Sequence, residues 1–207
     1  KLADDVYVCT DSSEIIEVCK KHQAKFIKTK STHKNGTDRI AEAAKKLNLN
    51  NRDLIVDVQG DEPLINPKDI DRTISFFQKN NFEIVVPNIK FGLRNKSNIV
   101  KMLINEKKRI LWMTRTDAPY HFDDQKPILS KHLSIIVFNY KSLIKYSKLK
   151  RSKFEKIESI ELLRAIENDM ILGSNLVKSN SFSVDVIEDF IKAKKFLKRD
   201  KIKRKYK

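Results

Sequence analysis

Two acidic residues follow a predicted buried strand near the middle of the chain. Residues 53–58 (Asp-Leu-Ile-Val-Asp-Val) form a short β-branched run, and residues 59–63 (Gln-Gly-Asp-Glu-Pro) leave it through a glycine, two adjacent carboxylates and a proline. Ligands of open α/β sheets bind beyond the carboxyl ends of the strands, where carboxylates can hold a hard cation such as magnesium beside phosphate oxygens. Composition alone favours an ordinary surface turn, because Gly, Asp and Pro are common turn residues. The rest of the chain must decide between the two interpretations.

Polar residues also follow other predicted strands, as expected for one ligand-binding edge of a sheet. They lie in residues 35–39 (Asn-Gly-Thr-Asp-Arg), at Thr114 and Arg115, at His132 and at Asp185. No zinc-ligand spacing joins the histidines, and no Gly-x-Ser-x-Gly, Walker or Gly-x-Gly-x-x-Gly pattern occurs. A serine hydrolase, a P-loop enzyme and a Rossmann dehydrogenase therefore lack support.

Strands and helices alternate in the first half of the chain. We expect strands over residues 6–10, 26–27, 54–58 and 83–86, and helices that begin near Asp11, Thr37 and Pro67. Asp11 is the expected N-cap of the first helix. The alternation predicts an α/β fold with a mainly parallel central sheet flanked by helices.

The second half is expected to contain a hairpin, two strands and three helices. The hairpin spans residues 99–104 and 109–113, the strands residues 133–138 and 171–177, and two of the helices residues 143–149 and 154–168. Asp185 begins the last helix. We expect its apolar side chains to face inward, namely Ile187, Phe190, Ile191 and Phe196.

Composition bounds the class of protein. The chain has 207 residues, of which 40% are hydrophobic, enough for a single well-buried domain over residues 1–207. Its net charge of +16 is compatible with nucleic acid, an acidic membrane or phosphorylated substrates, although the richness in Lys, Asn and Ile indicates AT-rich coding as its main source. Cys9 and Cys19 form no metal-ligand or disulfide pattern, which fits a reducing cytoplasm. No apolar run approaches the length of a membrane span, and no signal peptide is visible.

Several segments, taken in order, resemble one enzyme family. Residues 35–43 (Asn-Gly-Thr-Asp-Arg-Ile-Ala-Glu-Ala) and 58–65 (Val-Gln-Gly-Asp-Glu-Pro-Leu-Ile) closely resemble the 3-deoxy-manno-octulosonate cytidylyltransferases, or CMP-KDO synthetases. The similarity continues through residues 98–101, 114–120, 131–135, 155–164 and 183–189, and so covers almost the whole chain. The Gln-Gly-Asp-Glu-Pro motif alone is shared with other sugar nucleotidyltransferases, whereas the ordered set is far more specific.

The resemblance implies a nucleotide-diphospho-sugar transferase fold and a Mg²⁺-dependent reaction. CMP would be transferred from CTP to a 3-deoxy-ulosonic acid such as KDO, with release of pyrophosphate, in bacterial lipopolysaccharide synthesis. By the same resemblance, Asp61 and Asp185 are the catalytic, metal-binding residues, and Glu62 braces the turn. The nucleotide would be bound by Gly36, Thr37, Arg39 and Gln59, and the sugar by Arg115, His132 and Glu161.

Each of these residues also has a structural interpretation. Asp185 could be a helix N-cap, Gln59 could pack at the strand end, and His132 could be a structural histidine. Two arginines could form ion pairs instead: Arg39 with Asp38 or Glu42 at a helix start, and Arg115 on the surface. Glu158 could lie on the solvated face of its helix.

The chain departs from the family pattern in three places. The family begins with a strand and a basic, glycine-containing loop that grips the triphosphate, and nothing before Val6 matches it. Because the chain opens at Lys1 and not at Met, we expect a truncated record or a degenerate homologue that binds CTP poorly and turns over little. The second departure is in the sugar pocket, where Leu162 replaces Gln, Ser134 replaces Gly and Ile136 replaces Tyr. The third is that Val186 and Ile187 replace Thr-Pro after Asp185.

These departures leave alternatives open. The acceptor could be another sugar acid, or the chain could be a truncated or inactive homologue. A basic RNA-associated domain is a further alternative, which predicts salt-sensitive RNA binding. The leading hypothesis expects CTP and a sugar acid as partners, no nucleic acid and no membrane. The resemblance also suggests a homodimer built from residues 94–149.

Overall fold

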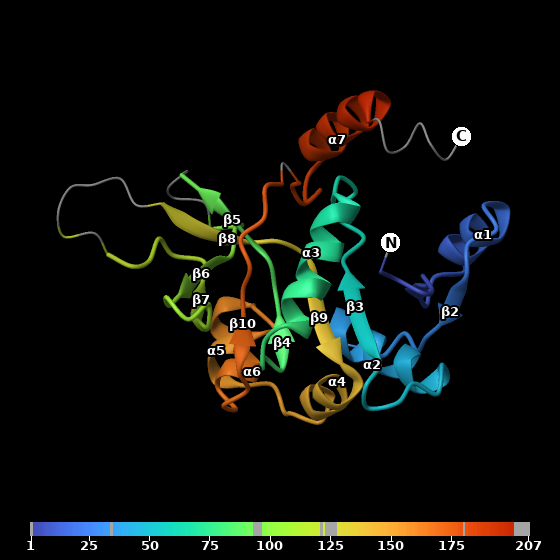
Figure 1. Ribbon diagram of the computed structural model, residues 1–207. Coiled ribbons are helices and arrows are strands. Elements are labelled where there is room, and N and C mark those ends of the chain that lie inside the picture. The colour runs from blue at the N-terminus through green and yellow to red at the C-terminus, as the bar shows by residue number, and fades with distance from the viewer. Residues whose placement is uncertain are drawn as a thin grey trace.

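A computed structural model of the protein describes residues 2–33, 35–92, 97–120, 122, 128–179 and 181–200, and shows two larger sheets with helices packed around them (Figure 1). The central sheet has the strand order β10 (Leu172–Gly173), β4 (Ile84–Val85), β9 (Ile135–Asn139) and β3 (Leu54–Val58). A separate parallel pair is formed by β1 (Val8–Thr10) and β2 (Phe26–Lys28). In the described part of the chain, no helix is long and apolar enough to cross a membrane.

The direction of strand β9 is the main difference from the predicted sheet. The α/β class is confirmed, and β10 pairs with β4 in parallel, but β9 runs antiparallel to both β3 and β4. The chain leaves β4 for the second sheet and returns through β9 from the opposite direction. Buried strands carry the same apolar runs in either direction, so the sequence pattern could not reveal this reversal.

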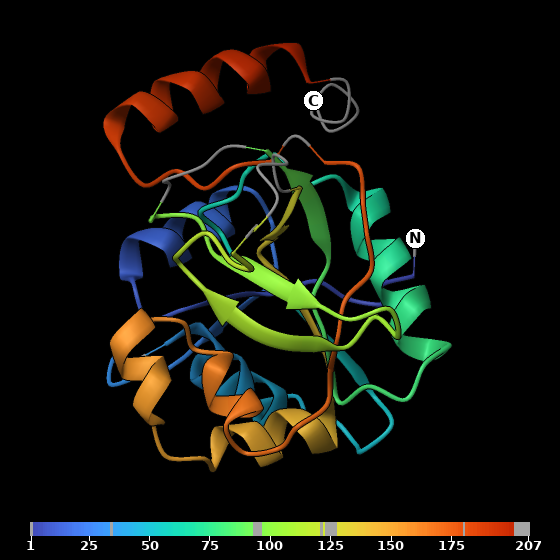
Figure 2. The ribbon, with the colours of Figure 1, turned by 90° about the vertical axis from the view of Figure 1, so that its left-hand side faces the viewer.

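The second sheet contains the predicted hairpin and is wholly antiparallel. Its order is β5 (Asn88–Phe91), β8 (Leu129–His132), β6 (Lys101–Ile104) and β7 (Ile110–Thr114). The pairing of β6 with β7 confirms the hairpin, with a register shift at Leu103 and Ile104. Figure 2 shows this sheet face-on in front of the central sheet.

The two faces of β9 pack against different helices, and this alternation forms the core. Ile136 and Phe138 belong to one buried cluster with residues of α2 (Gly36–Lys46) and α4 (Tyr140–Ser147). Ile135 and Val137 belong to another, with residues of α3 (Pro67–Gln78). Successive side chains of a strand point to opposite faces, so a strand with both faces buried reads as a continuous apolar run.

Two helices begin with side-chain caps that the sequence can explain. Asn35 caps α2 by accepting a hydrogen bond from the Asp38 N–H at 2.8 Å. The first helix, α1 (Ser13–Lys21), is capped by Ser12 and not by Asp11 as predicted. Asp11 pairs with Arg39 instead, so a tertiary contact moved the cap by one residue.

Three helices in the last third of the chain differ from the prediction. The single helix expected over residues 154–168 is divided into α5 (Lys153–Glu158) and α6 (Leu163–Ile166), because Ser159 adopts a left-handed conformation with φ of 52°. The last helix, α7 (Ile187–Arg199), does not turn its apolar residues inward. It stands at the edge of the molecule (Figure 1), and Ile187, Phe190, Ile191 and Phe196 are all exposed.

Candidate active site

A cavity of about 550 Å³ lies where the carboxyl end of β3 meets the second sheet and the segment that leads into α7. The predicted site residues on its wall are Gln59, Asp61, Arg115, His132, Glu161 and Asp185. Among the described residues, the remaining members of the predicted set, Gly36, Thr37 and Arg39, do not line it. Segments far apart in the sequence are thus brought to one cavity.

Glu62 fixes the turn that carries Asp61. Its side chain is 3% exposed, and its Oε1 accepts hydrogen bonds from the hydroxyl of Ser134 at 2.8 Å and of Ser183 at 3.3 Å. The Val184 N–H donates to the carbonyl of Asp61 at 2.9 Å. The end of β3 is therefore held against residues 183–185, and the expectation that Glu62 braces the turn is confirmed.

This bracing brings the carboxylates of Asp61 and Asp185 to the same cavity. Burial raises the pKa of Asp61, and the charges of Glu62 and Asp185 raise it further against the opposing effect of its own backbone N–H. Asp185 is not a helix N-cap, since that position is occupied by Val186. The Asp185 carboxylate is therefore left for the cavity, where it could serve a ligand.

The acid pair fits a magnesium site that a nucleotide would complete. Among the described residues, no three His, Cys, Asp or Glu side chains are placed to hold a metal ion by themselves. Mg²⁺ is typically bound by one or two carboxylates together with substrate phosphates, and keeps several waters. Two carboxylates at the wall of an open cavity are a suitable donor set for that arrangement.

Arg115 is held by backbone carbonyls. Its Nε donates to the Glu158 carbonyl at 2.7 Å, Nη1 to the Ser97 carbonyl at 3.1 Å and Nη2 to the Ser159 carbonyl at 3.1 Å. Glu158 in turn accepts from the Arg115 N–H at 2.9 Å and from the hydroxyl of Thr114 at 2.8 Å. Glu158 is thus no solvated-face residue, and Arg115 pins the left-handed turn that precedes Glu161.

His132 is kept neutral by its surroundings. Burial lowers its pKa to about 4, and the charge of Lys131 contributes to the lowering. At neutral pH its ring therefore carries one donor and one acceptor nitrogen and no charge. Such a group suits the binding of a sugar hydroxyl better than the neutralisation of an anion.

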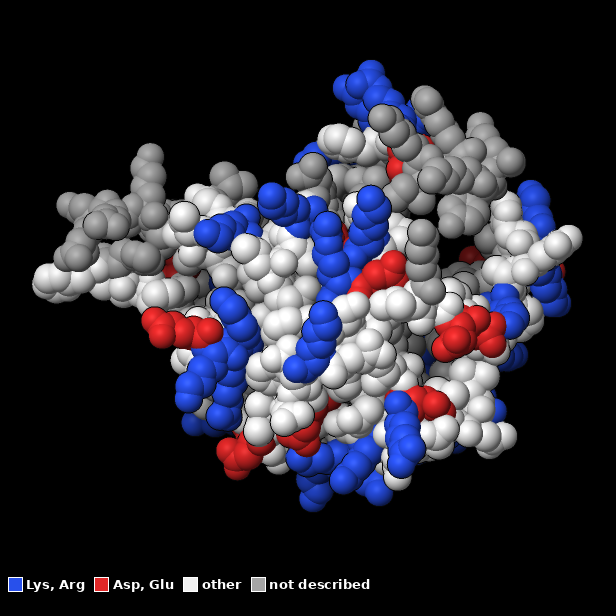
Figure 3. Space-filling view, viewed as in Figure 1, with Lys and Arg blue, Asp and Glu red and all other residues white. Residues whose placement is uncertain are grey.

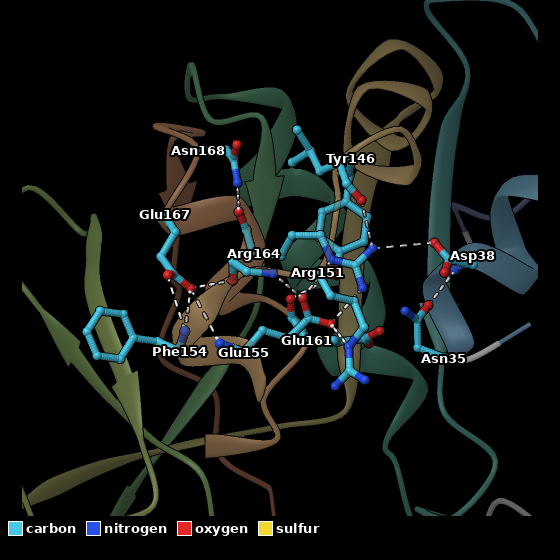
Figure 4. A network of polar contacts seen from close by, with 12 residues as sticks. Asn35, Asp38, Tyr146, Arg151, Phe154, Glu155, Glu161, Arg164, Glu167 and Asn168 are labelled. Atoms are coloured by element: carbon cyan, nitrogen blue, oxygen red, sulfur yellow. Dashed lines mark hydrogen bonds and ion pairs between the residues drawn. The ribbon is translucent and has the colours of Figure 1, made fainter. Parts of the chain in front are cut away.

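Glu161 sits between the cavity and a buried network of charged residues (Figure 4). Arg164, 2% exposed, binds Glu155 through Nε at 2.9 Å and Nη2 at 2.6 Å, and lies over the ring of Tyr146 at 4.9 Å. Its Nη1 is 3.7 Å from Asp38 at the start of α2. The hydroxyl of Tyr146 donates to the backbone carbonyl of Glu161 at 2.9 Å. Arg164 thereby joins the turn that carries Glu161 to α2.

The α2 N-terminus reaches the site from behind the cavity wall. Burial raises the pKa of Glu161, and contacts with the hydroxyl and backbone N–H of Thr37 oppose that rise. A side chain at Gly36 would lie 3.9 Å from Asp57 Oδ2. Arg39, in contrast, is paired with Asp11 at 2.8 Å and contacts Thr29, away from the cavity lining. Its paired partner is thus neither Asp38 nor Glu42.

Sequence reasoning missed two charged residues on buried strands. Asp57 on β3 is 5% exposed, and burial raises its pKa to about 7, with the charges of Glu161 and Asp61 adding to the rise. Lys131 on β8 is 9% exposed and lines the cavity. For Asp57 the available signal was a charged residue inside an otherwise apolar strand, which is rarely buried without a partner, whereas Lys131 is flanked by Ser130 and His132 and gave no such signal.

The comparisons with known proteins agree with this geometry. The model of the Cytidylyltransferase family matches residues 1–175. A 3-deoxy-manno-octulosonate cytidylyltransferase from Thermodesulfovibrio yellowstonii is 35% identical over 95% of this chain and 83% of its own length. The enzyme of the same name from Rickettsia prowazekii is 36% identical, over 93% and 78%. An 8-amino-3,8-dideoxy-manno-octulosonate cytidylyltransferase from Shewanella sp. (strain W3-18-1) is 32% identical, over 93% and 81%.

Solved structures share the fold. The structure of a CMP:2-keto-3-deoxy-manno-octonic acid synthetase complexed with CTP superposes with a TM-score of 0.87 at 24% identity, covering 95% of this chain and 82% of that one. A putative glucose-1-phosphate thymidylyltransferase from Bacillus anthracis gives a TM-score of 0.58 at 11% identity, over 88% and 70%. At these identities the superpositions speak for the fold, a nucleotidyltransferase architecture. On the family model and the extended similarity to its relatives, the chain belongs to the cytidylyltransferase family.

Proposed function

We propose that the protein transfers CMP from CTP to a 3-deoxy-ulosonic acid such as KDO and releases pyrophosphate, in the synthesis of lipopolysaccharide. The observation that carries this proposal is the meeting of Asp61 and Asp185 in one cavity with Gln59, His132 and Glu161. The cavity thus combines two acids that can hold a metal ion with side chains that can bind hydroxyls, in a space of small-molecule size. The family membership supports the choice of cytidine nucleotide.

In this proposal Asp61 and Asp185 bind Mg²⁺, whose charge would neutralise the α-phosphate and favour attack by the anomeric hydroxyl. The bond from the α-phosphorus to the oxygen that bridges to the β-phosphate breaks, a bond from the same phosphorus to the sugar oxygen forms, the hydroxyl proton passes to solvent, and pyrophosphate leaves. Gln59 offers a donor and an acceptor to ligand hydroxyls, as does the neutral ring of His132. Glu161 offers its carboxyl oxygens to the sugar hydroxyls as hydrogen-bond acceptors.

The nucleotide roles proposed for Thr37 and Arg39 are indirect. Thr37 meets Glu161, and the position of Gly36 lies close to Asp57, so both residues shape the wall behind the site. Arg39 holds the ends of β1 and β2 against α2 through Asp11 and Thr29. A base could approach the backbone at Gly36, where no side chain intervenes.

The lining of the cavity bears on the choice of acceptor. Leu162 and Ile136 are each 1% exposed and present apolar surface to the cavity, and the hydroxyl of Ser134 is bonded to Glu62. A pocket with fewer hydrogen-bonding groups discriminates less against a changed hydroxyl. A related sugar acid, such as the 8-amino acid named for the Shewanella relative, is the second candidate acceptor.

We further propose that the protein acts in the cytoplasm, as a homodimer that uses residues 94–149. Residues 94–96, 121 and 123–127 of that segment lie outside the described residues. A function in RNA binding has less support, because the Lys and Arg side chains in Figure 3 are spread over several parts of the visible face with acidic residues among them. A nucleic-acid site usually gathers them in one patch or stripe.

The test is pyrophosphate release from CTP with Mg²⁺ and a panel of sugar acids that includes KDO and its 8-amino analogue. Millimolar CTP and a high protein concentration are used. Asp61→Asn and Asp185→Asn should each lower release by about 100-fold or more, whereas Glu106→Gln, at an exposed hairpin turn, should not. Two outcomes would refute the proposal: release of pyrophosphate without any sugar acid, and no release with any sugar acid of the panel.

A further inference from the structure

Two buried lysines lie directly opposite each other in the second sheet. Lys101 on β6 and Lys131 on β8 are cross-strand partners, with exposed fractions of 0% and 9%. Like charges at opposed positions destabilise a sheet, and a buried ammonium group is costly unless it is paired. Each lysine therefore needs a compensating partner.

Lys101 has its partners within the protein. Its Nζ lies 3.2 Å from Oδ1 of Asp117 and donates a hydrogen bond of 2.6 Å to the carbonyl of Arg115. It does not belong to the described lining of the cavity. Its charge is compensated, and its role is to tie β6 to the segment that follows β7.

Lys131 differs from Lys101 in both respects. It lines the cavity, and its Nζ contacts the carbonyl of Ser181 at 3.4 Å, which is long for a hydrogen bond. Among the described residues, no carboxylate lies within ion-pair distance of it. A buried cation on a cavity wall with one weak contact indicates that a ligand supplies the opposite charge.

The other cation expected to bind an anionic ligand is already engaged. Nε, Nη1 and Nη2 of Arg115 each donate to a backbone carbonyl, so the guanidinium cannot present its Nε–Nη2 edge as a free fork to a carboxylate. Asp61 is hydrogen-bonded to Val184 and lies beside Asp185, where a metal ion would accompany the phosphates. Ser181, which contacts Lys131, lies four residues before Asp185 in the segment that leads into α7. The Lys131 ammonium and the acid pair therefore lie along the same segment.

We infer that Lys131 binds the carboxylate of the sugar acid substrate and that Arg115 is a positioning residue that holds the turn before Glu161. The inference rests on the proposed function and deepens it by naming the residue that selects a sugar acid over a neutral sugar. The triphosphate of CTP is the other anion in the reaction. The test must therefore distinguish binding of Lys131 to the sugar carboxylate from binding to the triphosphate.

The test compares the binding of a 3-deoxy-ulosonic acid and of its C1 carboxamide, measured by calorimetry on the 207-residue chain. The wild type should prefer the acid by about 10- to 100-fold, as expected for a charge-assisted hydrogen bond in a buried site. Lys131→Met should abolish that preference and leave the affinity for the carboxamide and for CTP unchanged. Lys131→Arg should retain part of the preference, because it keeps the charge.

The matched control is Lys90→Met, which removes an exposed ammonium from β5, the strand that pairs with β8. It should leave the preference intact. Thermal unfolding checks the fold, and Lys131→Met should unfold at the same or a higher temperature, since it removes a poorly paired buried charge. If Lys131→Met fails to fold, Lys131→Gln takes its place in the comparison, because it removes the charge and keeps a polar end.

The outcomes separate this inference from the function on which it rests. If the wild type binds no sugar acid, the proposed function fails and the inference fails with it. If the wild type prefers the acid more than tenfold and the variant that lacks the charge prefers it equally strongly, only the inference is wrong. A loss of CTP affinity in Lys131→Met with an unchanged acid preference would assign the lysine to the phosphates and overturn the inference.

Discussion

The network around Arg164 allows a sharp prediction for the substitution Arg164→Met. The change removes the two hydrogen bonds to Glu155, at 2.9 and 2.6 Å, and the stacking on Tyr146 (Figure 4). Glu155 is 2% exposed and would keep only the N–H of Ser152 at 3.1 Å and Nε of Arg151 at 3.2 Å. Breaking one side of a buried ion pair typically costs about 3–5 kcal/mol.

That cost can be measured as a change in unfolding. For a domain of this size, about 3–5 kcal/mol corresponds to a fall in Tm of roughly 6–20 °C. Arg164→Lys should lose less, because it keeps the charge but not the bidentate geometry. The matched control is Arg52→Met at an exposed turn, which should change the free energy of unfolding by no more than about 0.5 kcal/mol.

The pH dependence of the same pair provides an independent check. Burial tends to raise the pKa of Glu155, but hydrogen bonds from Arg164, Ser152 and Arg151 outweigh it and bring the pKa below its ordinary value. A carboxylate with a lowered pKa stabilises the fold above its unfolded pKa, and this stabilisation is lost as the pH falls through the folded value. The difference in stability between wild type and Arg164→Met should therefore shrink on acidification below about pH 4.

The double variant Arg164→Met/Glu155→Met tests whether the cost comes from the Glu155 carboxylate that has lost Arg164. It should be more stable than Arg164→Met alone, since two apolar side chains leave no unpaired buried charge. Equal stability of the double and single variants, or a Tm of Arg164→Met within 2 °C of wild type, would refute this reasoning.

Two further predictions concern single residues. Because the pKa of His132 falls from 6.5 to about 4 on folding, the unfolded chain binds more protons between those values, so stability should decrease from pH 6.5 to pH 4 by up to about 3 kcal/mol. His132→Gln should flatten this part of the pH profile in chemical denaturation, and an unchanged slope would contradict the assignment. A side chain at Gly173 would meet the ring of Phe82 at 2.3 Å, so Gly173→Ala should destabilise the protein by about 1–3 kcal/mol. Gly92→Ala, which meets nothing within 4 Å, is its control in the same thermal unfolding assay, and equal Tm values for the two variants would show that the ring moves aside.

Local patterns in the sequence were enough for several elements. The hairpin of β6 and β7 and the start of α2, expected near Thr37 and found at Gly36, depend on residues a few positions apart, and both lie within a residue or two of the predicted positions. The α/β class followed from the alternation of strands and helices. The family resemblance also selected Gln59, Asp61 and Asp185, which the fold brings to one cavity.

Tertiary structure decided the features that depend on distant partners. The direction of β9 depends on the path of the chain through the second sheet, and apolar patterning is the same for either direction. The break at Ser159 is accompanied by hydrogen bonds from Arg115 to the carbonyls of Glu158 and Ser159, which no local pattern around the helix reveals.

The contrast between Lys101 and Lys131 illustrates the same limit at the level of function. In the sequence Lys101 follows Val100, Lys131 lies between Ser130 and His132, and neither context reveals which lysine has a partner. In the structure Lys101 meets Asp117, whereas Lys131 faces the cavity with one long contact. The sequence by itself determined which side chains were available for chemistry. Only the tertiary structure decided which of them have partners within the protein, because the partner of a buried charge is set by the packing of segments remote in the chain.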